Sequence, residues 1–122
     1  MVNATPAVLL EKTPRQALDA LEEGMGLSEE ALAQALGTSR RTLQRWRGGT
    51  AYPQQPARRR LAALLELLGR VQETFKGTET PRRWFHTPSR YLAGITPAEA
   101  IRVGRLDRVE ADLESLHSGA FL

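Results

Sequence analysis

The chain has 122 residues, 41% of them hydrophobic, and a formal net charge of +3 at pH 7. This length allows one compact domain or two very small domains that share a core, and it argues against a large catalytic cleft. The chain has no cysteine, which excludes disulfides and thiolate metal ligands and suits a reducing compartment.

Residues 1–12 are expected to form a flexible N-terminus. Its first ten residues, MVNATPAVLL, lack the basic n-region and the long apolar core of a signal peptide. The longest apolar run, Leu61 to Leu65, is far shorter than a membrane span. We therefore expect a cytoplasmic protein without a membrane partner.

Thr-Pro pairs predict several helix starts, because Thr is a good N-cap and Pro fits the first helical position. The pair at Thr13 predicts a helix that ends near Gly24 and buries Ala17, Leu18 and Leu21. This helix would be a scaffold behind the segment that follows it.

A helix-turn-helix is predicted between Leu27 and Arg47. Its first helix is capped by Ser28, Gly37 allows a sharp turn, and Ser39 caps the second helix. The apolar positions of the two helices would hold them together at a steep angle; they are Leu32, Ala33, Leu36, Leu43 and Trp46.

The second helix of this motif has a cationic side opposite Leu43 and Trp46. We expect its first polar side chains to enter the major groove of DNA, where Arg pairs with guanine and Gln with adenine. The predicted groove contacts are Arg40, Arg41 and Gln44, with Ser39 adding a hydroxyl or backbone donor, while Arg45 and Arg47 would bind phosphates.

Charge is unevenly distributed around this motif. Residues 1–37 carry six acidic and two basic side chains, whereas residues 38–60 carry seven arginines and no acid. Three of these arginines, Arg58, Arg59 and Arg60, begin a long helix, where the macrodipole opposes cations. Contact with phosphate would offset that cost and is the reading we favour; the alternative is a solvated face.

The long helix follows a loop over residues 50–56 and is expected to end at Gly77. Its apolar stripe has helical spacing and consists of Leu61, Leu64, Leu65, Leu68, Val71, Gln72 and Phe75.

The last third of the chain is too short for a core of its own and must pack on the rest. Thr80-Pro81 opens a short helix with Trp84 and Phe85, and one turn follows over residues 88–92. Thr96 and Glu99 form a capping box. A final helix is expected after Gly104, starting with a second box at Asp107 and Glu110; it carries Leu106, Val109, Leu113 and Leu116.

Catalytic chemistry is not expected. His86 and His117 are the only histidines, no carboxylates have metal-ligand spacing, and Gly48-Gly49 is a helix stop rather than a phosphate loop. We predict no enzyme activity, no metal site and no cofactor.

The second half has a distinctive set of residues, which are Trp84, Pro88, Tyr91, Leu92, Gly94, Pro97, Gly104, Val109, Leu113, Leu116, Gly119, Ala120 and Phe121. In these residues it resembles the toxin-binding region of Xre/MbcA/ParS antitoxins, and the first half resembles the Xre-type domain that precedes it. The resemblance covers the chain from about Thr13 onward. It departs at Leu92-Ala93-Gly94, where Leu-Gly-Gly is expected.

The resemblance implies an all-α antitoxin of a type II pair that represses its own operon and blocks a RES-domain toxin, an enzyme that consumes NAD. It implies an Xre-like DNA-binding domain over residues 13–76 and a toxin-binding domain over residues 77–122. Gly119, Ala120, Phe121 and Leu122 would then plug the active site of the toxin. A buried Phe contributes about 1.5 to 3 kcal/mol, and the terminal carboxylate suits an anion site. Without the resemblance, Phe121 is simply expected to fold back on the last helix.

Two other functions are compatible with the residues. A stand-alone phage-type repressor would use its C-terminal half for dimerisation, and an inhibitor could keep the helix-turn-helix without binding DNA. The uncompensated arginines argue against the inhibitor. Because one motif covers few base pairs, operator binding predicts a homodimer or higher oligomer.

Overall fold

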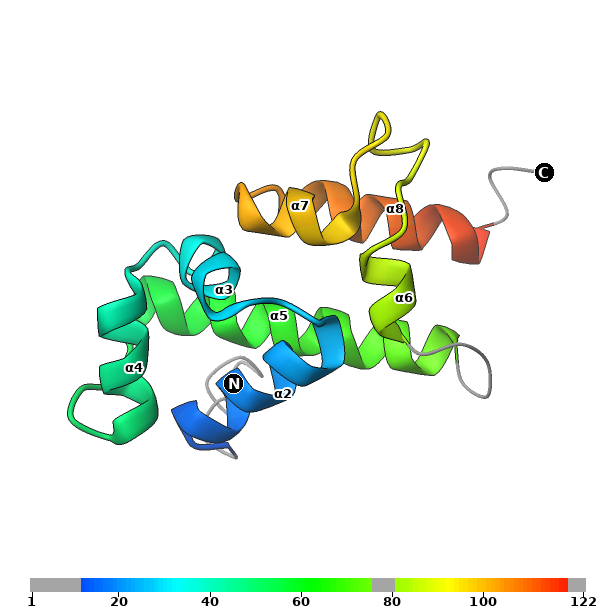
Figure 1. The fold of residues 1–122 in the computed structure, drawn as a ribbon. Helices are drawn as coiled ribbons and strands as arrows, with labels where there is room; N and C mark the ends of the chain where they lie inside the picture. Colours follow the sequence, from blue (N-terminus) through cyan, green and yellow to red (C-terminus); the bar gives the residue numbers. More distant parts are fainter. Residues whose placement is uncertain (1–11, 76–80, 119–122) are drawn as a thin grey trace.

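The computed structural model describes residues 12–75 and 81–118. Within these ranges the chain is all-α and contains no strand, as the sequence predicts (Figure 1). The helices are α2 (Pro14–Met25), α3 (Glu29–Ala35), α4 (Arg40–Gly48), α5 (Gln55–Thr74), α6 (Pro81–Phe85), α7 (Pro97–Arg102) and α8 (Leu106–Ser118).

Four helices begin at the predicted caps. The hydroxyl of Thr13 accepts a hydrogen bond from the backbone N–H of Gln16. The side-chain oxygen of Gln16 accepts one from the backbone N–H of Thr13, which completes a capping box. Ser28, Ser39 and Thr96 accept equivalent bonds at the starts of α3, α4 and α7. These local bonds satisfy backbone donors that the first turn of a helix leaves free.

Other boundaries differ from the predictions. Helix α2 continues past Gly24 to Met25, and Gly26, with a left-handed φ of 70°, caps its end. Gly24 serves close packing instead, because a Cβ there would lie 2.7 Å from Leu68 Cδ2. Helix α5 starts at Gln55, inside the predicted loop, and ends at Thr74; Gly77 lies outside the described residues.

The predicted second capping box is wrong. Helix α8 already begins at Leu106, so Asp107 lies inside the first turn rather than before it. Its carboxylate accepts two bonds from Arg105 at 3.1 Å each. At the predicted box of α7, Thr96 does cap the helix, but the Glu99 carboxylate pairs with Arg102. An arginine nearby in sequence thus pairs with each of these acids.

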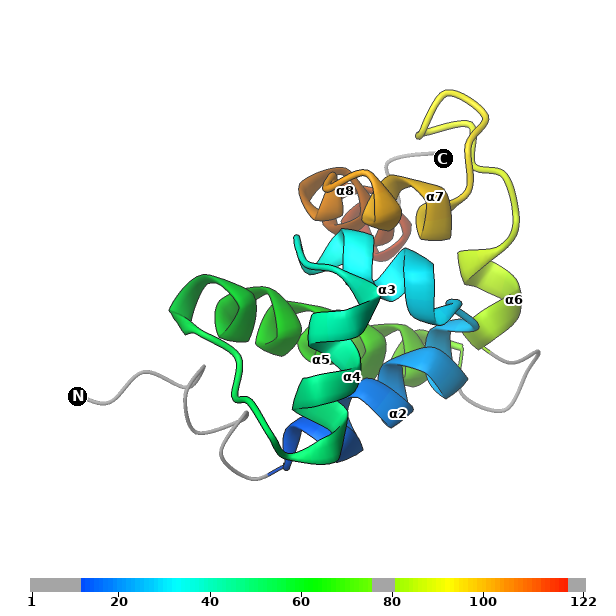
Figure 2. The same cartoon turned by 60° about the vertical axis from the view of Figure 1, so that its left-hand side comes forward.

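Buried residues from both halves form one hydrophobic cluster. Helix α5 contacts α2, α6 and α8, and α7 packs on α3. Figure 2 shows α7 and α8 lying over α3 and α5, while α4 runs below α3 beside α2. Because several helices cover α5, its buried residues include Leu67, which the predicted stripe omits. Gln72, which the predicted stripe includes, is exposed.

Polar and aromatic contacts fix the C-terminal half on this core. The ring of Trp84 lies 6.0 Å from that of Phe75 and 5.2 Å from that of Phe85. The Nε2 of His86 lies 2.9 Å from the carbonyl of Met25, at the end of α2. The segment between α6 and α7 is held by Ser89, whose hydroxyl donates to buried Asp112 at 2.8 Å.

Candidate functional site

Helices α3 and α4 form the predicted helix-turn-helix. Gly37 has a φ of 73°, which favours glycine, and the backbone N–H of Thr38 donates to the carbonyl of Ala33 at 2.9 Å. The five apolar side chains assigned to the inner side are all buried: Leu32, Ala33, Leu36, Leu43 and Trp46. The prediction of the motif and its packing is confirmed.

The outer side of α4 is polar and cationic. Arg40, Arg41, Gln44 and Arg45 are exposed there, and Ser39 is exposed at its N-terminus. In Figure 1 this helix stands at one end of the molecule, away from α6 and α8. The side chains expected to contact bases therefore lie on an accessible helix face.

Arg47 differs from the other arginines of α4. Its guanidinium pairs with the carboxylate of Asp19 and donates to Glu22 Oε2 at 2.7 Å, and its side chain is only 22% exposed. The motif thus uses Arg47 to anchor α4 to α2. From the sequence we predicted that Arg47 binds a DNA phosphate. Such a contact would require the Arg47 guanidinium to leave both carboxylates.

Glu29, which the sequence analysis did not consider as a site residue, contacts the cationic side of α4. Its Oε1 lies 3.5 Å from the Nε of Arg40 and accepts a bond from the Nε2 of Gln44 at 3.2 Å. Arg40 and Gln44 lie one helical turn apart, so a single carboxylate reaches both. A spacing of 15 residues between Glu29 and Gln44 gives no local signal for this contact.

The start of α5 brings further arginines to the same end of the molecule. Arg58 is half-buried, donates to the carbonyl of Pro53 at 3.1 Å, and lies 5.8 Å from the ring centre of Tyr52. Arg59 and Arg60 are exposed, and a side chain at Gly37 would collide with the guanidinium of Arg60. The basic start of α5 therefore lies beside the turn that leads into α4.

The predicted plug residues, Gly119, Ala120, Phe121 and Leu122, lie outside the described residues. The described part of the C-terminal half exposes several large apolar side chains, and Leu116 of the predicted final helix is among them. They are Tyr91, Ile95, Val103 and Leu116.

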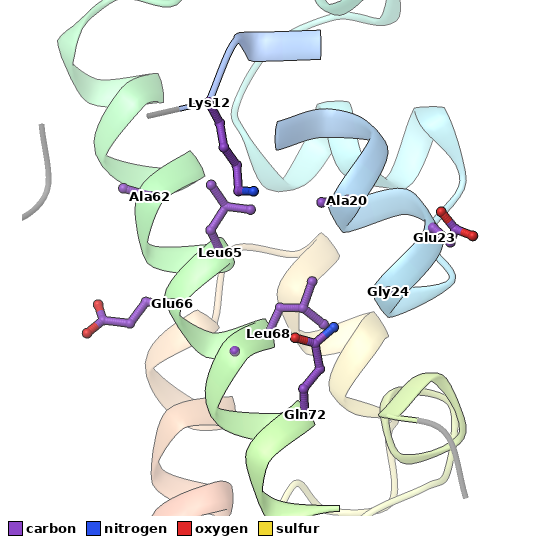
Figure 3. A pocket seen from close by; sticks show the side chains of 10 residues that line it. Lys12, Ala20, Glu23, Gly24, Ala62, Leu65, Glu66, Leu68 and Gln72 are labelled. Carbon is purple, nitrogen blue, oxygen red and sulfur yellow. The ribbon is translucent and has the colours of Figure 1, made fainter. Parts of the chain in front are cut away.

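Residues of α2 and α5 line a groove of about 590 Å³. Figure 3 shows Leu65 and Leu68 on its α5 side, whereas Glu23 and Glu66 point away to either side. These carboxylates do not converge as a paired acid and base would. No group of three potential metal ligands occurs among the described residues, and none of the helices described is long and apolar enough to cross a membrane.

Each half of the chain matches a known protein domain. Residues 70–119 match the antitoxin Xre/MbcA/ParS C-terminal toxin-binding domain, and residues 13–49 match the homeodomain-like domain. The mycobacterial cidal antitoxins MbcA of Mycobacterium tuberculosis and Mycobacterium bovis are 28% identical over 100 residues, which cover 82% of this chain and 88% of each relative.

A solved structure has a similar fold. It is the crystal structure of the M. tuberculosis MbcT–MbcA toxin–antitoxin complex, in which one chain matches with a TM-score of 0.63 and 25% identity. The match covers 91% of this chain and 99% of that chain. A homeodomain-like match over residues 13–49, a toxin-binding match over residues 70–119 and the likeness to MbcA together support an Xre/MbcA-type antitoxin.

Proposed function

We propose that this antitoxin neutralises a RES-domain, NAD-consuming toxin and represses its own operon. The observation that carries the toxin half is the match of residues 70–119 to a toxin-binding domain. The likeness to MbcA, solved in complex with the toxin MbcT, supports a protein partner. The toxin's RES fold and its chemistry come from the family resemblance. The antitoxin itself acts by binding and not by catalysis.

In this proposal residues 77–122 form the toxin-binding domain and Gly119 to Leu122 enter the active site of the toxin. The experiment is co-expression of the toxin encoded beside this chain with three antitoxins: the full chain, a chain ending at Ser118, and Tyr52→Ala. The last variant removes an exposed apolar side chain from the loop between α4 and α5. We expect only the truncated chain to lose neutralisation. Equal protection by the truncated chain would show that the plug is wrong, and absence of any toxin partner would favour the plain repressor.

Residues 13–76 are proposed to bind operator DNA, and the exposed cations of α4 are the observation that favours this. Arg40, Arg41 and Gln44 would contact bases, with Ser39 beside them. The proposed phosphate contacts are Arg45, Arg58, Arg59 and Arg60. Arg47 is the least favoured of the predicted set, given its two carboxylate partners.

DNA binding is tested with a fragment of the chain's own promoter and a scrambled fragment at physiological salt. Arg40→Ala or Arg41→Ala should cost roughly 1 to 3 kcal/mol at one base position, whereas Arg59→Ala should weaken binding to all sequences alike. Arg108→Ala on α8 makes the same charge change away from the motif and should leave both affinities nearly unchanged. Equal affinity of the wild-type chain for the two fragments would contradict the proposal.

Operator binding also requires that two copies present their motifs together, because one motif distinguishes few base pairs. We therefore propose a homodimer or higher oligomer on DNA. The stoichiometry on a promoter fragment, measured by light scattering, checks this: a single copy per saturated operator is the contrary result.

A further inference from the structure

Glu29 is placed to control which base the α4 helix selects. It is the first residue of α3, and its side chain is 27% exposed at the edge of the cationic surface. The same carboxylate oxygen lies 3.2 Å from Gln44 Nε2 and 3.5 Å from Arg40 Nε. We infer that Glu29 is a positioning residue that fixes the amide of Gln44 for adenine; the inference rests on the proposed DNA-binding function.

The direction of the Gln44 amide follows from hydrogen-bond chemistry. An ionised carboxylate only accepts hydrogen bonds, so the amide must turn its nitrogen, and not its oxygen, toward Glu29. One of the two N–H bonds of Gln44 is then used within the protein. When the bond to Glu29 uses the N–H that points away from the amide oxygen, this oxygen and the second N–H remain together on the free edge of the side chain.

This free edge of the Gln44 amide matches adenine better than guanine. Adenine offers an N6 donor and an N7 acceptor in the major groove, which complement the oxygen and the N–H of the amide. Guanine offers two acceptors, O6 and N7, so the amide oxygen would face another acceptor. An unrestrained amide could rotate to reduce this mismatch, whereas the bond to Glu29 opposes the rotation.

The same carboxylate has an opposite effect on overall affinity. It partly neutralises Arg40 and adds negative charge beside a surface that would approach phosphates. Arg41 and Arg45, on the same helix, form no ion pair with any residue of the described ranges. Glu29 thus weakens attraction to any DNA while it sharpens the choice at one base pair.

Two nearly isosteric substitutions separate these effects. Glu29→Gln keeps an amide oxygen that accepts from Gln44, whereas Glu29→Met has a similar length but lacks a strong acceptor. Both remove the charge, and both are good helix formers. Glu30→Gln, on the next residue of α3, is the charge-matched control.

The measurement is binding to a panel of promoter fragments in which each base pair is replaced in turn. The position that loses its preference in Gln44→Ala identifies the base facing Gln44. There, we expect an adenine-over-guanine preference of about tenfold or more in the wild-type chain. Glu29→Met should reduce it to less than about threefold, whereas Glu29→Gln and Glu30→Gln should retain it. Both Glu29 variants should bind scrambled DNA more tightly than the wild-type chain.

The outcomes distinguish this inference from the proposed function. A wild-type chain with no sequence preference overturns the DNA-binding proposal, whatever Glu29 does. If the wild-type chain is selective and Gln44→Ala relaxes one position, an unchanged preference in folded Glu29→Met overturns the role of Glu29. An equal loss of preference in Glu29→Gln would also contradict it, because the amide oxygen should substitute for the carboxylate. Circular dichroism melting of each variant verifies that it is folded.

Discussion

The guanidinium of Arg102 donates to the amide oxygen of Gln34 at 2.7 Å and thereby joins the end of α7 to α3. Helix α3 is the first helix of the helix-turn-helix, and α7 belongs to the region that matches a toxin-binding domain. The bond is therefore a direct polar link between the two functional halves. Glu99, on the opposite side of the guanidinium, keeps it in place through a bond to Arg102 Nε at 3.1 Å.

Replacing Arg102 by Ala should lower the melting temperature by a few degrees, because the change removes bonds both within α7 and across to α3. Arg105→Ala is the matched control, since Arg105 pairs with Asp107 only two residues away. The smaller effect is expected for this local pair. Differential scanning fluorimetry compares the two variants, and equal shifts would argue against a stabilising role for the bond between α7 and α3.

The pairing of Glu99 with Arg102 should also affect how stability changes at acidic pH. The hydrogen bond from Arg102 lowers the pKa of Glu99 below its ordinary value. A carboxyl whose pKa is lower in the folded state stabilises the fold above its unfolded pKa, and this contribution is lost as the pH falls through the folded pKa. Stability should therefore decrease between about pH 5 and pH 3.

Glu99→Gln should make this part of the curve shallower, because the amide does not titrate. Arg105 lowers the pKa of Asp107 in the same way, so some acid sensitivity should persist until Asp107→Asn is added. Urea unfolding at stepwise pH values measures the slope. Parallel curves for the wild-type chain and Glu99→Gln would contradict the assignment.

Arg47 and Arg45, two positions apart on α4, should have opposite phenotypes. Arg47→Met breaks the pairing with Asp19 and Glu22 and should cost roughly 0.5 to 1.5 kcal/mol of unfolding free energy. Arg45→Met should leave stability nearly unchanged but weaken binding to every DNA sequence. Chemical denaturation and DNA titration of both variants make the comparison. A stable Arg47→Met chain with reduced DNA affinity would restore Arg47 to the phosphate contacts.

Replacing Ala93 by glycine, the residue that the family pattern has there, should make the fold more stable. It has a φ of 61°, a left-handed conformation that is unfavourable for a residue with a Cβ. Ala93→Gly should therefore raise stability by about 0.5 to 1 kcal/mol, after the larger entropy of glycine in the unfolded chain is included. Gly94→Ala is the reverse control: its φ is 93° and nothing lies within 4 Å of the added Cβ, so any loss reports backbone strain. A less stable Ala93→Gly chain would contradict this explanation.

Much of the fold could be predicted because its signals are local. Thr13, Ser28, Ser39 and Thr96 each lie three residues before the backbone N–H that they accept, so the sequence alone indicates where these helices begin. The inner side of the motif follows from helical periodicity in the same way. The family resemblance added the order of the two halves, which periodicity could not supply.

The contacts that were missed depend on how helices cross. Arg47 meets Asp19 and Glu22 across 28 and 25 residues of sequence. Helical spacing placed Arg47 with the exposed cations of α4, and only the position of α2 shows that it faces carboxylates. Leu67 was omitted for a related reason, because the partners of α5 cover more than one side of that helix.

The single cluster of buried residues has a consequence for how long this antitoxin persists in a cell. Since the core is shared, neither half can unfold fully without exposing side chains of the other. Binding of a toxin to the C-terminal half would raise the free energy of unfolding of the whole unit, including the helix-turn-helix. We expect a protease that attacks unfolded chain to remove DNA binding and toxin neutralisation together, and a bound toxin to protect both.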